Sequence, residues 1–245
     1  MYKSKALIGF ILLCYVLFTI FEFSGNDLVA YNLNSLIVPL IALTYILFIK
    51  KKSILFFLFL IFYSIADLMG LVISNMPLDQ TLKLYDFEYY VGNSLYILAY
   101  IFLIIKIGKT LSLSYIMKNF KIHLLVLISL SIYLVYVLHV IINPNLVLES
   151  DYYIELIYNI VVVVLLTTAL LNYFYKDNKK SLYQFLGSIC FAFSEFIDVA
   201  YIYIMQKSLL NVIATTLALG AFYFFYQQSK LLNEKTKEKN YMLFD

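Results

Sequence analysis

The chain has 245 residues, of which 63% are hydrophobic and only 13% are charged. A soluble domain of this length would carry about 25% charged residues, so the composition excludes a soluble globular protein and indicates an integral membrane protein with little mass outside the bilayer. The net charge of +3 comes from lysines dispersed over short segments, which does not favour a nucleic-acid partner.

Eight stretches are apolar and long enough to cross a bilayer, which takes about twenty residues. They are predicted at residues 6–23, 33–49, 53–74, 89–107, 122–142, 152–173, 182–205 and 209–228. Pro39 lies inside the second stretch and is expected to kink that helix. The predicted fold class is therefore all-α, a polytopic membrane bundle of about eight transmembrane helices. Residues 1–229 form a single transmembrane domain, and residues 230–245 form a polar cytoplasmic tail.

The distribution of lysine predicts how these helices are oriented. With a cytoplasmic N-terminus, every lysine except Lys83 and Lys207 falls on the cytoplasmic side. These lysines are Lys3, Lys5, Lys50, Lys51, Lys52, Lys106, Lys109, Lys118, Lys121, Lys176, Lys179, Lys180, Lys230, Lys235, Lys237 and Lys239. Because cytoplasmic loops carry an excess of positive residues, both termini are predicted to be cytoplasmic. The first apolar stretch has no cleavage signal and is predicted to be the first span, and we expect a protein of the bacterial inner membrane.

Two acidic residues lie inside apolar stretches, just past the middle of each. Asp67 is in the third stretch and Glu195 is in the seventh. A carboxylate in the hydrocarbon core costs about 2.5–3.5 kcal/mol on insertion scales, so such a residue indicates a functional site by default. If the eight predicted helices are divided into two successive sets of four, each acid lies on the third helix of its set. This is compatible with a chain built from two four-helix halves.

Helical spacing places further polar groups beside these acids. Ser188, Glu195 and Asp198 share one face of the seventh helix, and Ser64 lies one turn before Asp67 in the third. All of them are expected to point into the bundle. Two carboxyl groups that lie close together in a low dielectric cannot both ionise cheaply, so such a pair supplies an acid and a base for hydrolysis. The alternative is that the carboxyl groups satisfy one another or a backbone carbonyl.

Other polar residues inside the spans are weaker candidates. Asn93 and Tyr100 lie in the fourth stretch and Asn159 lies in the sixth. An amide in hydrocarbon needs partners, whereas tyrosine is so frequent, with 24 residues, that most of them are expected to serve packing or the membrane interface. The chain has two histidines and no Cys–His spacing, so we expect no metal site and no cofactor. A nucleophile elbow and a phosphate-binding glycine loop are also absent from the sequence.

Several segments resemble the YhhN-like lysoplasmalogenase family, a group of eight-span membrane proteins. Residues 63–68 resemble its S-x-x-G-D-x-L segment, and residues 187–195 are similar to its G-A-x-x-F-x-x-S-D motif. Residues 92–100 resemble a span of that family in which a glycine is followed by an aromatic residue, a small residue and a tyrosine. Residues 220–227 resemble its closing span. The likeness covers most of the chain, in the same order and at matching span positions.

The sequence departs from the family pattern at several positions. Ala66 stands where the family has glycine, and Glu195 stands where aspartate is usual. The histidine often found in the fourth span is replaced by Ile97 or Leu98, depending on the alignment. Glutamate in place of aspartate keeps the carboxyl group and moves it by one methylene.

The resemblance implies an enzyme that cleaves the vinyl ether bond of lysoplasmalogens and releases a fatty aldehyde. Our hypothesis from the sequence is therefore a membrane lipid hydrolase in which Asp67 and Glu195 form the catalytic acid/base pair. The supporting residues would be Asp198, Ser64, Asn93, Tyr100 and Asn159. The expected partner is a lysophospholipid substrate from the membrane, and a homo-oligomer is compatible with such a bundle. The alternatives are a proton- or cation-coupled small-molecule transporter and a non-catalytic lipid-binding or sensor relative.

Overall fold

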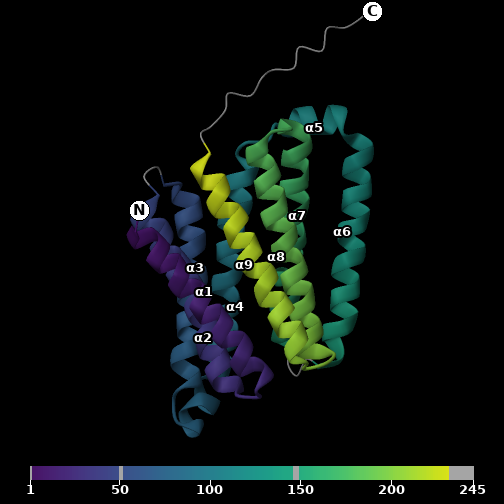
Figure 1. Cartoon of the computed structure of the whole chain (residues 1–245). Helices are drawn as coiled ribbons and strands as arrows, with labels where there is room; N and C mark the ends of the chain where they lie inside the picture. The colour runs from purple at the N-terminus through teal and green to yellow at the C-terminus, as the bar shows by residue number, and fades with distance from the viewer. Residues whose placement is uncertain (1, 50–51, 146–148, 232–245) are drawn as a thin grey trace, which may run out of the picture.

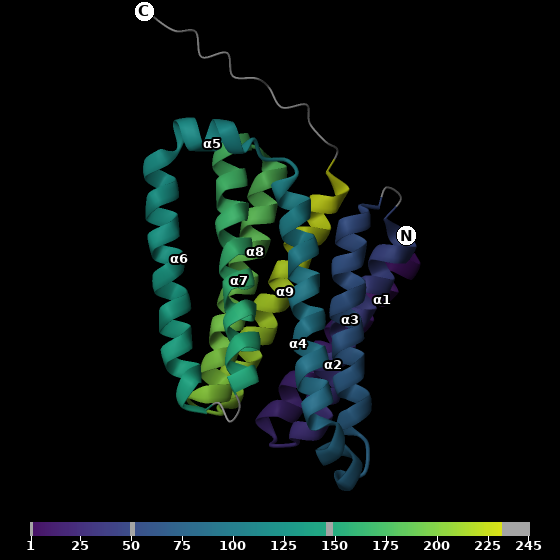
Figure 2. The ribbon, with the colours of Figure 1, turned by 180° about the vertical axis from the view of Figure 1, so that it is seen from behind.

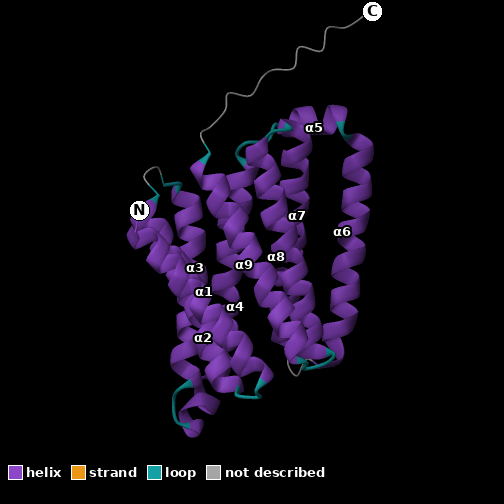
Figure 3. Cartoon of the chain, viewed as in Figure 1, coloured by secondary structure: helices purple, strands orange, loops and turns teal. Residues whose placement is uncertain are grey.

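The computed structural model describes residues 2–49, 52–145 and 149–231, and this part of the chain contains helices and no strands (Figure 3). The helices are α1 (Tyr2–Phe23), α2 (Asp27–Phe48), α3 (Ile54–Ser74), α4 (Leu78–Gly108), α5 (Leu113–Asn119), α6 (Lys121–Ile142), a 3-10 turn η1 (Asn143–Asn145), α7 (Glu149–Lys176), α8 (Lys179–Tyr203) and α9 (Ser208–Lys230). All except α5 and η1 are long and apolar enough to cross a membrane. The predicted all-α bundle with eight candidate spans is confirmed over these residues.

Some helix boundaries differ from the apolar pattern. α2 begins at Asp27, α4 at Leu78 and α7 at Glu149, each earlier than the hydropathy indicated. Hydropathy follows a helix only inside the hydrocarbon core, so polar first turns beyond it go unnoticed. The seven-residue helix α5, which lies across one end of the bundle (Figure 1), is too short for an apolar period to reveal it. Of the predicted polar tail, residues 232–245 lie outside the described residues.

Six helices form a ring around the interior of the bundle. Their order is α2, α3, α4, α7, α8 and α9, and each packs against the next. α2 and α9 close the ring but touch only lightly, and α1 packs on α2 and also contacts α9. α6 stands outside the ring against α7 and α8, at the edge of the molecule (Figures 1 and 2). The ring is therefore tightly packed everywhere except at the junction of α2 with α9.

Aromatic side chains pack the centre of this ring. Phe59 on α3 is fully buried. Its ring centroid lies 5.6–6.4 Å from those of Phe56, Tyr63, Tyr100, Phe191, Phe222 and Phe225. Aromatic pairs at such separations attract one another beyond the area that they bury. Gly187 allows α8 to approach this cluster, because a Cβ atom there would lie 2.7 Å from Cε2 of Phe225.

The two ends of the bundle differ in charge. One end of the bundle holds the start of α1, the ends of α2, α4, α7 and α9, and the starts of α3, α6 and α8 (Figure 1). We call it the lysine-rich end, because Lys52, Lys109, Lys118, Lys121 and Lys179 are all exposed there. The opposite end, where α2, α4 and α7 begin, we call the acidic end, and Asp27, Asp79 and Asp86 are exposed there.

Polar side chains join the ring helices near the lysine-rich end. The hydroxyl of Thr110 donates to Oδ1 of Asn172 at 2.8 Å, and Nδ2 of Asn172 donates to Oε1 of Gln184 at 2.7 Å. The ammonium group of Lys106 donates to Oε1 of Gln228 at 2.7 Å. Hydrogen bonds between membrane helices contribute about 0.6 kcal/mol each on average, so these contacts tie α4, α7, α8 and α9 together without dominating stability.

Candidate functional site

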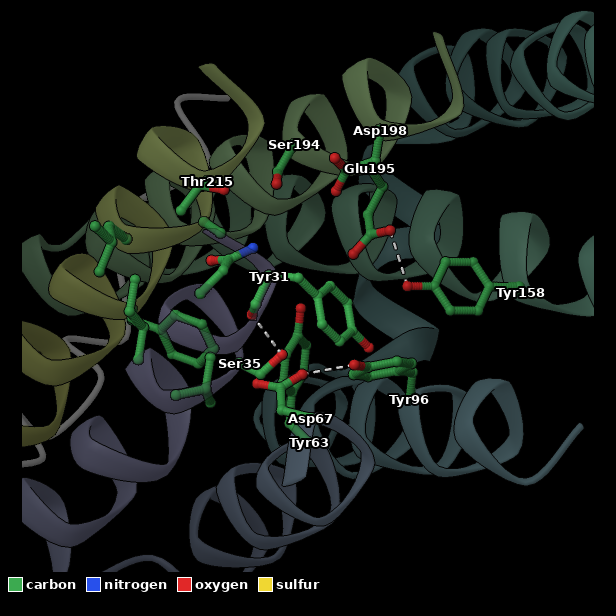
Figure 4. A pocket seen from close by; sticks show the side chains of 16 residues that line it. Tyr31, Ser35, Tyr63, Asp67, Tyr96, Tyr158, Ser194, Glu195, Asp198 and Thr215 are labelled. Atoms are coloured by element: carbon green, nitrogen blue, oxygen red, sulfur yellow. Dashed lines mark hydrogen bonds between the residues drawn. The ribbon is translucent and has the colours of Figure 1, made fainter. Parts of the chain in front are cut away.

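A cavity of about 200 Å³ lies inside the ring of helices (Figure 4). All six ring helices contribute residues to its wall. The ionisable side chains that line it are those of Asp67, Glu195 and Asp198 together with the tyrosines Tyr31, Tyr63, Tyr96 and Tyr158. Since no basic residue is among the described residues of the wall, the only full charge that the wall itself can carry is negative.

Asp67 reaches the cavity from α3. The hydroxyl of Tyr96 on α4 donates to its Oδ1 at 2.5 Å (Figure 4). Gly70, one turn further along α3, lies against the phenol of Tyr31, and a Cβ atom at Gly70 would collide with the Tyr31 hydroxyl. A buried carboxyl group needs hydrogen-bond partners. Tyr96 supplies one to Asp67, while Gly70 leaves room for a second phenol beside it.

Glu195 projects into the cavity from α8, on the opposite side from Asp67 (Figure 4). The hydroxyl of Tyr100 on α4 donates to its Oε1, and the hydroxyl of Tyr158 on α7 donates to its Oε2 at 2.8 Å. Hydrogen bonds to a carboxylate are stronger than those between neutral groups. The carboxyl group of Glu195 is therefore held by phenols from two other helices, one on each oxygen.

Two further polar residues of α8 lie beside Glu195. Asp198 lines the cavity one turn further along the helix. Ser194 also lines it, and its hydroxyl donates to the backbone carbonyl of Ala214 on α9 at 2.8 Å. This bond joins α8 to α9 at the level of the cavity. Ser188, earlier on the same face, is fully buried outside the cavity wall, and its hydroxyl has no hydrogen-bond partner in the structure.

The cavity brings together the acids that the sequence singled out. Asp67, Glu195 and Asp198 all line it. Tyr100 is not part of the wall, but it contacts the cavity through its hydrogen bond to Glu195. The acids of the third and seventh predicted spans therefore share one chamber, although 128 residues separate Asp67 from Glu195 in the sequence.

The other three sequence candidates lie away from the cavity wall. Ser64 is buried, and its hydroxyl donates to the backbone carbonyl of Leu60 at 2.7 Å. The side chain of Asn93 donates to the backbone carbonyl of Tyr89 at 2.9 Å. Asn159 is buried on α7 beside Tyr158 but does not belong to the described wall. For Ser64 and Asn93 the helix backbone, rather than a shared site, supplies the partner that a polar group in the membrane needs.

Three tyrosines of the site were not predicted from the sequence. Tyr31, Tyr63 and Tyr158 line the cavity but are three among 24 tyrosines, so residue type alone gave no reason to choose them. For Tyr158 a signal was present, because Asp151, Glu155 and Tyr158 follow helical spacing and share one face of α7.

That face of α7 carries a row of carboxyl and phenol contacts from the acidic end to the cavity. Asp151 accepts a hydrogen bond from Tyr90 at 2.6 Å. Glu155 accepts bonds from Tyr89 at 2.9 Å and from Tyr203 at 3.1 Å. Tyr158, the next residue of the row, donates to Glu195. The row therefore places ionisable side chains at successive turns of α7 between the acidic end and the cavity.

The side chains of the cavity define what it can do chemically. Over the described part of the chain, no group of three or more His, Cys, Asp or Glu residues is arranged to hold a metal ion. Carboxyl groups can donate and accept protons, and a carboxylate can stabilise a positive charge that develops nearby. The arrangement of Asp67 and Glu195 around one space therefore suits acid–base chemistry on a bound molecule.

No known protein family, curated protein or solved structure matches the chain.

Proposed function

We propose that the protein is a membrane hydrolase that cleaves the vinyl ether bond of lysoplasmalogen-like lysophospholipids, as a divergent member of the YhhN-like lysoplasmalogenase family. The observation that carries the proposal is that Asp67 and Glu195 line one cavity inside a candidate membrane bundle. Further support comes from the resemblance of residues 63–68 and 187–195 to the motifs of that family. A lipid substrate fits a site that lies among membrane helices.

The proposed reaction needs an acid and a base, and the two carboxyl groups supply them. One carboxylic acid transfers its proton to the β-carbon of the vinyl ether, and the π electrons of the double bond form the new C–H bond. The resulting oxocarbenium ion is stabilised by the negative charge of the second carboxylate, which then accepts a proton from the attacking water. This division of roles parallels that of the two carboxyl groups of glycosidases.

The products follow from the hemiacetal that water addition forms. Its C–O bond to glycerol breaks as the hemiacetal hydroxyl returns a proton to the first carboxylate and the glycerol oxygen takes the proton that the second carboxyl group accepted from water. A fatty aldehyde and a glycerophospho-headgroup are released. One water molecule is consumed and no net proton is taken up or lost. A cavity of about 200 Å³ has room for water beside the reacting carbon.

The direct test uses the purified full-length protein in lipid nanodiscs. A 1-alkenyl lysophosphoethanolamine is expected to yield fatty aldehyde and glycerophosphoethanolamine in equal amounts. The matched control is the saturated 1-alkyl analogue, which lacks the double bond that must be protonated and is expected to yield neither. Failure to form aldehyde from any alkenyl lysolipid would contradict the proposal.

The phenols that hold Glu195 are expected to contribute by positioning it. Tyr158→Phe removes one hydrogen bond to the carboxylate, and bonds to charged groups contribute about 1.5–3 kcal/mol. We therefore expect kcat for aldehyde release to fall by about tenfold or more, with KM little changed and the pH profile of kcat displaced. The control is Tyr153→Phe, because Tyr153 is an exposed tyrosine of the same helix. A change in KM alone would contradict a positioning role.

A second function, proton- or cation-coupled transport, is favoured by one observation. Asp151, Glu155 and Tyr158 lie at successive turns of one face of α7, from the acidic end to the hydrogen bond between Tyr158 and Glu195. Membrane transporters use carboxyl chains of this kind as proton relays. The two functions are separated by reconstituting the protein into liposomes: substrate-dependent proton flux without lipid turnover would favour transport, whereas aldehyde release without flux would favour hydrolysis.

We propose a bacterial inner-membrane location, as expected from the sequence. From the positive-inside rule we infer that the lysine-rich end lies in the cytoplasm. In a variant with Cys14 and Cys190 replaced by alanine, Lys52→Cys is expected to react with an impermeant maleimide only in inverted vesicles. Lys207→Cys is expected to react only from the periplasmic side. Both lysines are exposed and lie at opposite ends of the bundle. The reverse labelling pattern would overturn the orientation.

A further inference from the structure

The weakest junction of the helix ring coincides with the apolar part of the cavity wall. α2 and α9 touch only lightly. The apolar residues of the wall are Ile37 and Val38 on α2 and Ala218, Leu219 and Phe222 on α9. We call these five residues the apolar wall. The carboxyl groups line the cavity from α3 and α8, and α2 and α9 also contribute the polar residues Tyr31, Asn34, Ser35 and Thr215 to its wall. The apolar wall is therefore the apolar part of the lining that α2 and α9 supply.

Two side chains of the apolar wall separate the cavity from α1. Ile37 and Leu219 line the cavity and also pack in a small apolar cluster with Ile11 and Cys14 of α1. Ile11, Cys14 and Ile37 are buried in this cluster. A molecule that displaced Ile37 and Leu219 would therefore meet α1 and, beside it, the lipid that surrounds the candidate spans.

Polar contacts join α1 to α9 beside this partition, and a proline interrupts α2. α1 is bound to α9 by a hydrogen bond between the hydroxyl groups of Tyr15 and Thr216 at 2.7 Å and by a bond from Ser208 to the backbone carbonyl of Glu22 at 3.1 Å. In α2, Pro39 lies inside the helix next to the apolar wall. Proline removes one backbone hydrogen bond and kinks a helix. α2 is therefore easier to bend here than an unbroken helix would be.

The size of the cavity requires that a lipid extend beyond it. Sites that enclose a drug-sized ligand measure about 300–1,000 Å³, whereas this cavity measures about 200 Å³. It can hold the reacting vinyl ether and water but not a whole lysophospholipid. The hydrocarbon chain must leave through the wall. A chain that covers the apolar wall leaves no polar group without a partner, so we expect the chain to pass there.

We propose that the hydrocarbon chain of a single-chain lipid lies between α2 and α9, having displaced Ile37 and Leu219, and passes under α1 into the bilayer. This inference rests on the proposed function, because it places the chain of that substrate. The residue that limits access is Leu219, since it belongs both to the cavity wall and to the contact with α1.

The test uses a saturated 1-alkyl lysophosphocholine with a diazirine in its chain, added to the full-length protein in nanodiscs. After irradiation, we expect mass spectrometry to locate adducts at the apolar wall and on the adjoining face of α1, and excess unlabelled lysolipid to remove them. Leu219→Trp is expected to reduce these adducts by roughly tenfold or more, because a larger ring must be displaced from a filled site. The control is Ile213→Trp, a partly exposed residue of α9 outside the cavity wall.

The outcomes separate this inference from the proposed reaction. Competable adducts at the apolar wall without aldehyde release from an alkenyl lysolipid would support the chain site and overturn the reaction. The opposite outcome is aldehyde release together with adducts that lie only on outward-facing positions and whose amount Leu219→Trp does not change. It would overturn the chain site and leave the reaction standing. Leu219→Ala, which enlarges the opening, serves as the second variant if the tryptophan variant does not fold, and it is expected to retain or increase the adducts.

Discussion

Asp67→Asn and Glu195→Gln are each expected to lower the rate of aldehyde release from an alkenyl lysolipid by about 10²–10⁴-fold, the range that general acid–base catalysis contributes. Each substitution keeps the shape of the side chain. Asp67→Asn retains a carbonyl oxygen for the bond from Tyr96, whereas Glu195→Gln retains one for Tyr100 or Tyr158 and turns its amide N–H towards the other phenol. The amide can neither donate the proton to the vinyl ether nor carry the negative charge that stabilises the cation. The loss should therefore appear in kcat while the protein still folds.

The matched control for these variants is Asp86→Asn, because Asp86 is an exposed carboxyl residue of α4 outside the cavity. It is expected to leave aldehyde release unchanged. Asp198→Asn should show an intermediate loss, since Asp198 lines the cavity beside Glu195. Normal aldehyde release by both Asp67→Asn and Glu195→Gln would show that these carboxyl groups do not catalyse the reaction.

Phe59→Ala is expected to produce the largest loss of stability among single substitutions in the core. In soluble proteins, Phe→Ala in a filled core lowers the free energy of unfolding by about 3–5 kcal/mol. We expect the lower end of that range, about 3 kcal/mol, because an unfolded membrane helix remains in lipid and the lost term is mainly packing. The measurement is unfolding in mixed detergent micelles, followed by circular dichroism.

The control for Phe59→Ala is Phe193→Ala on α8, because Phe193 is half exposed at the surface of the bundle. It is expected to change stability little. Phe59 also packs against Tyr63 and Tyr100. A partial loss of aldehyde release should therefore accompany the loss of stability, since Tyr100 holds Glu195. Equal stability of the Phe59→Ala and Phe193→Ala variants would contradict the central role of the aromatic cluster.

The sequence by itself determined the number of candidate spans, the segregation of lysine to alternate connections and the presence of interior carboxyl groups. These properties depend on one helix at a time. Whether a stretch is apolar over about twenty residues, and whether an acid such as Asp67 interrupts it, requires no knowledge of the neighbouring helices. For the same reason, the face shared by Glu195 and Asp198 could be predicted from helical spacing alone.

The tertiary structure alone decided which partners meet in the cavity. Tyr158 and Glu195 are 37 residues apart and Tyr100 and Glu195 are 95 apart. Residue type alone does not identify which of the many tyrosines turn towards an acid. Ser64 and Asn93 found partners in their own helices instead. The cost of burying a polar group can be read from the sequence, but the group that satisfies it depends on which helices become neighbours, and only packing settles that.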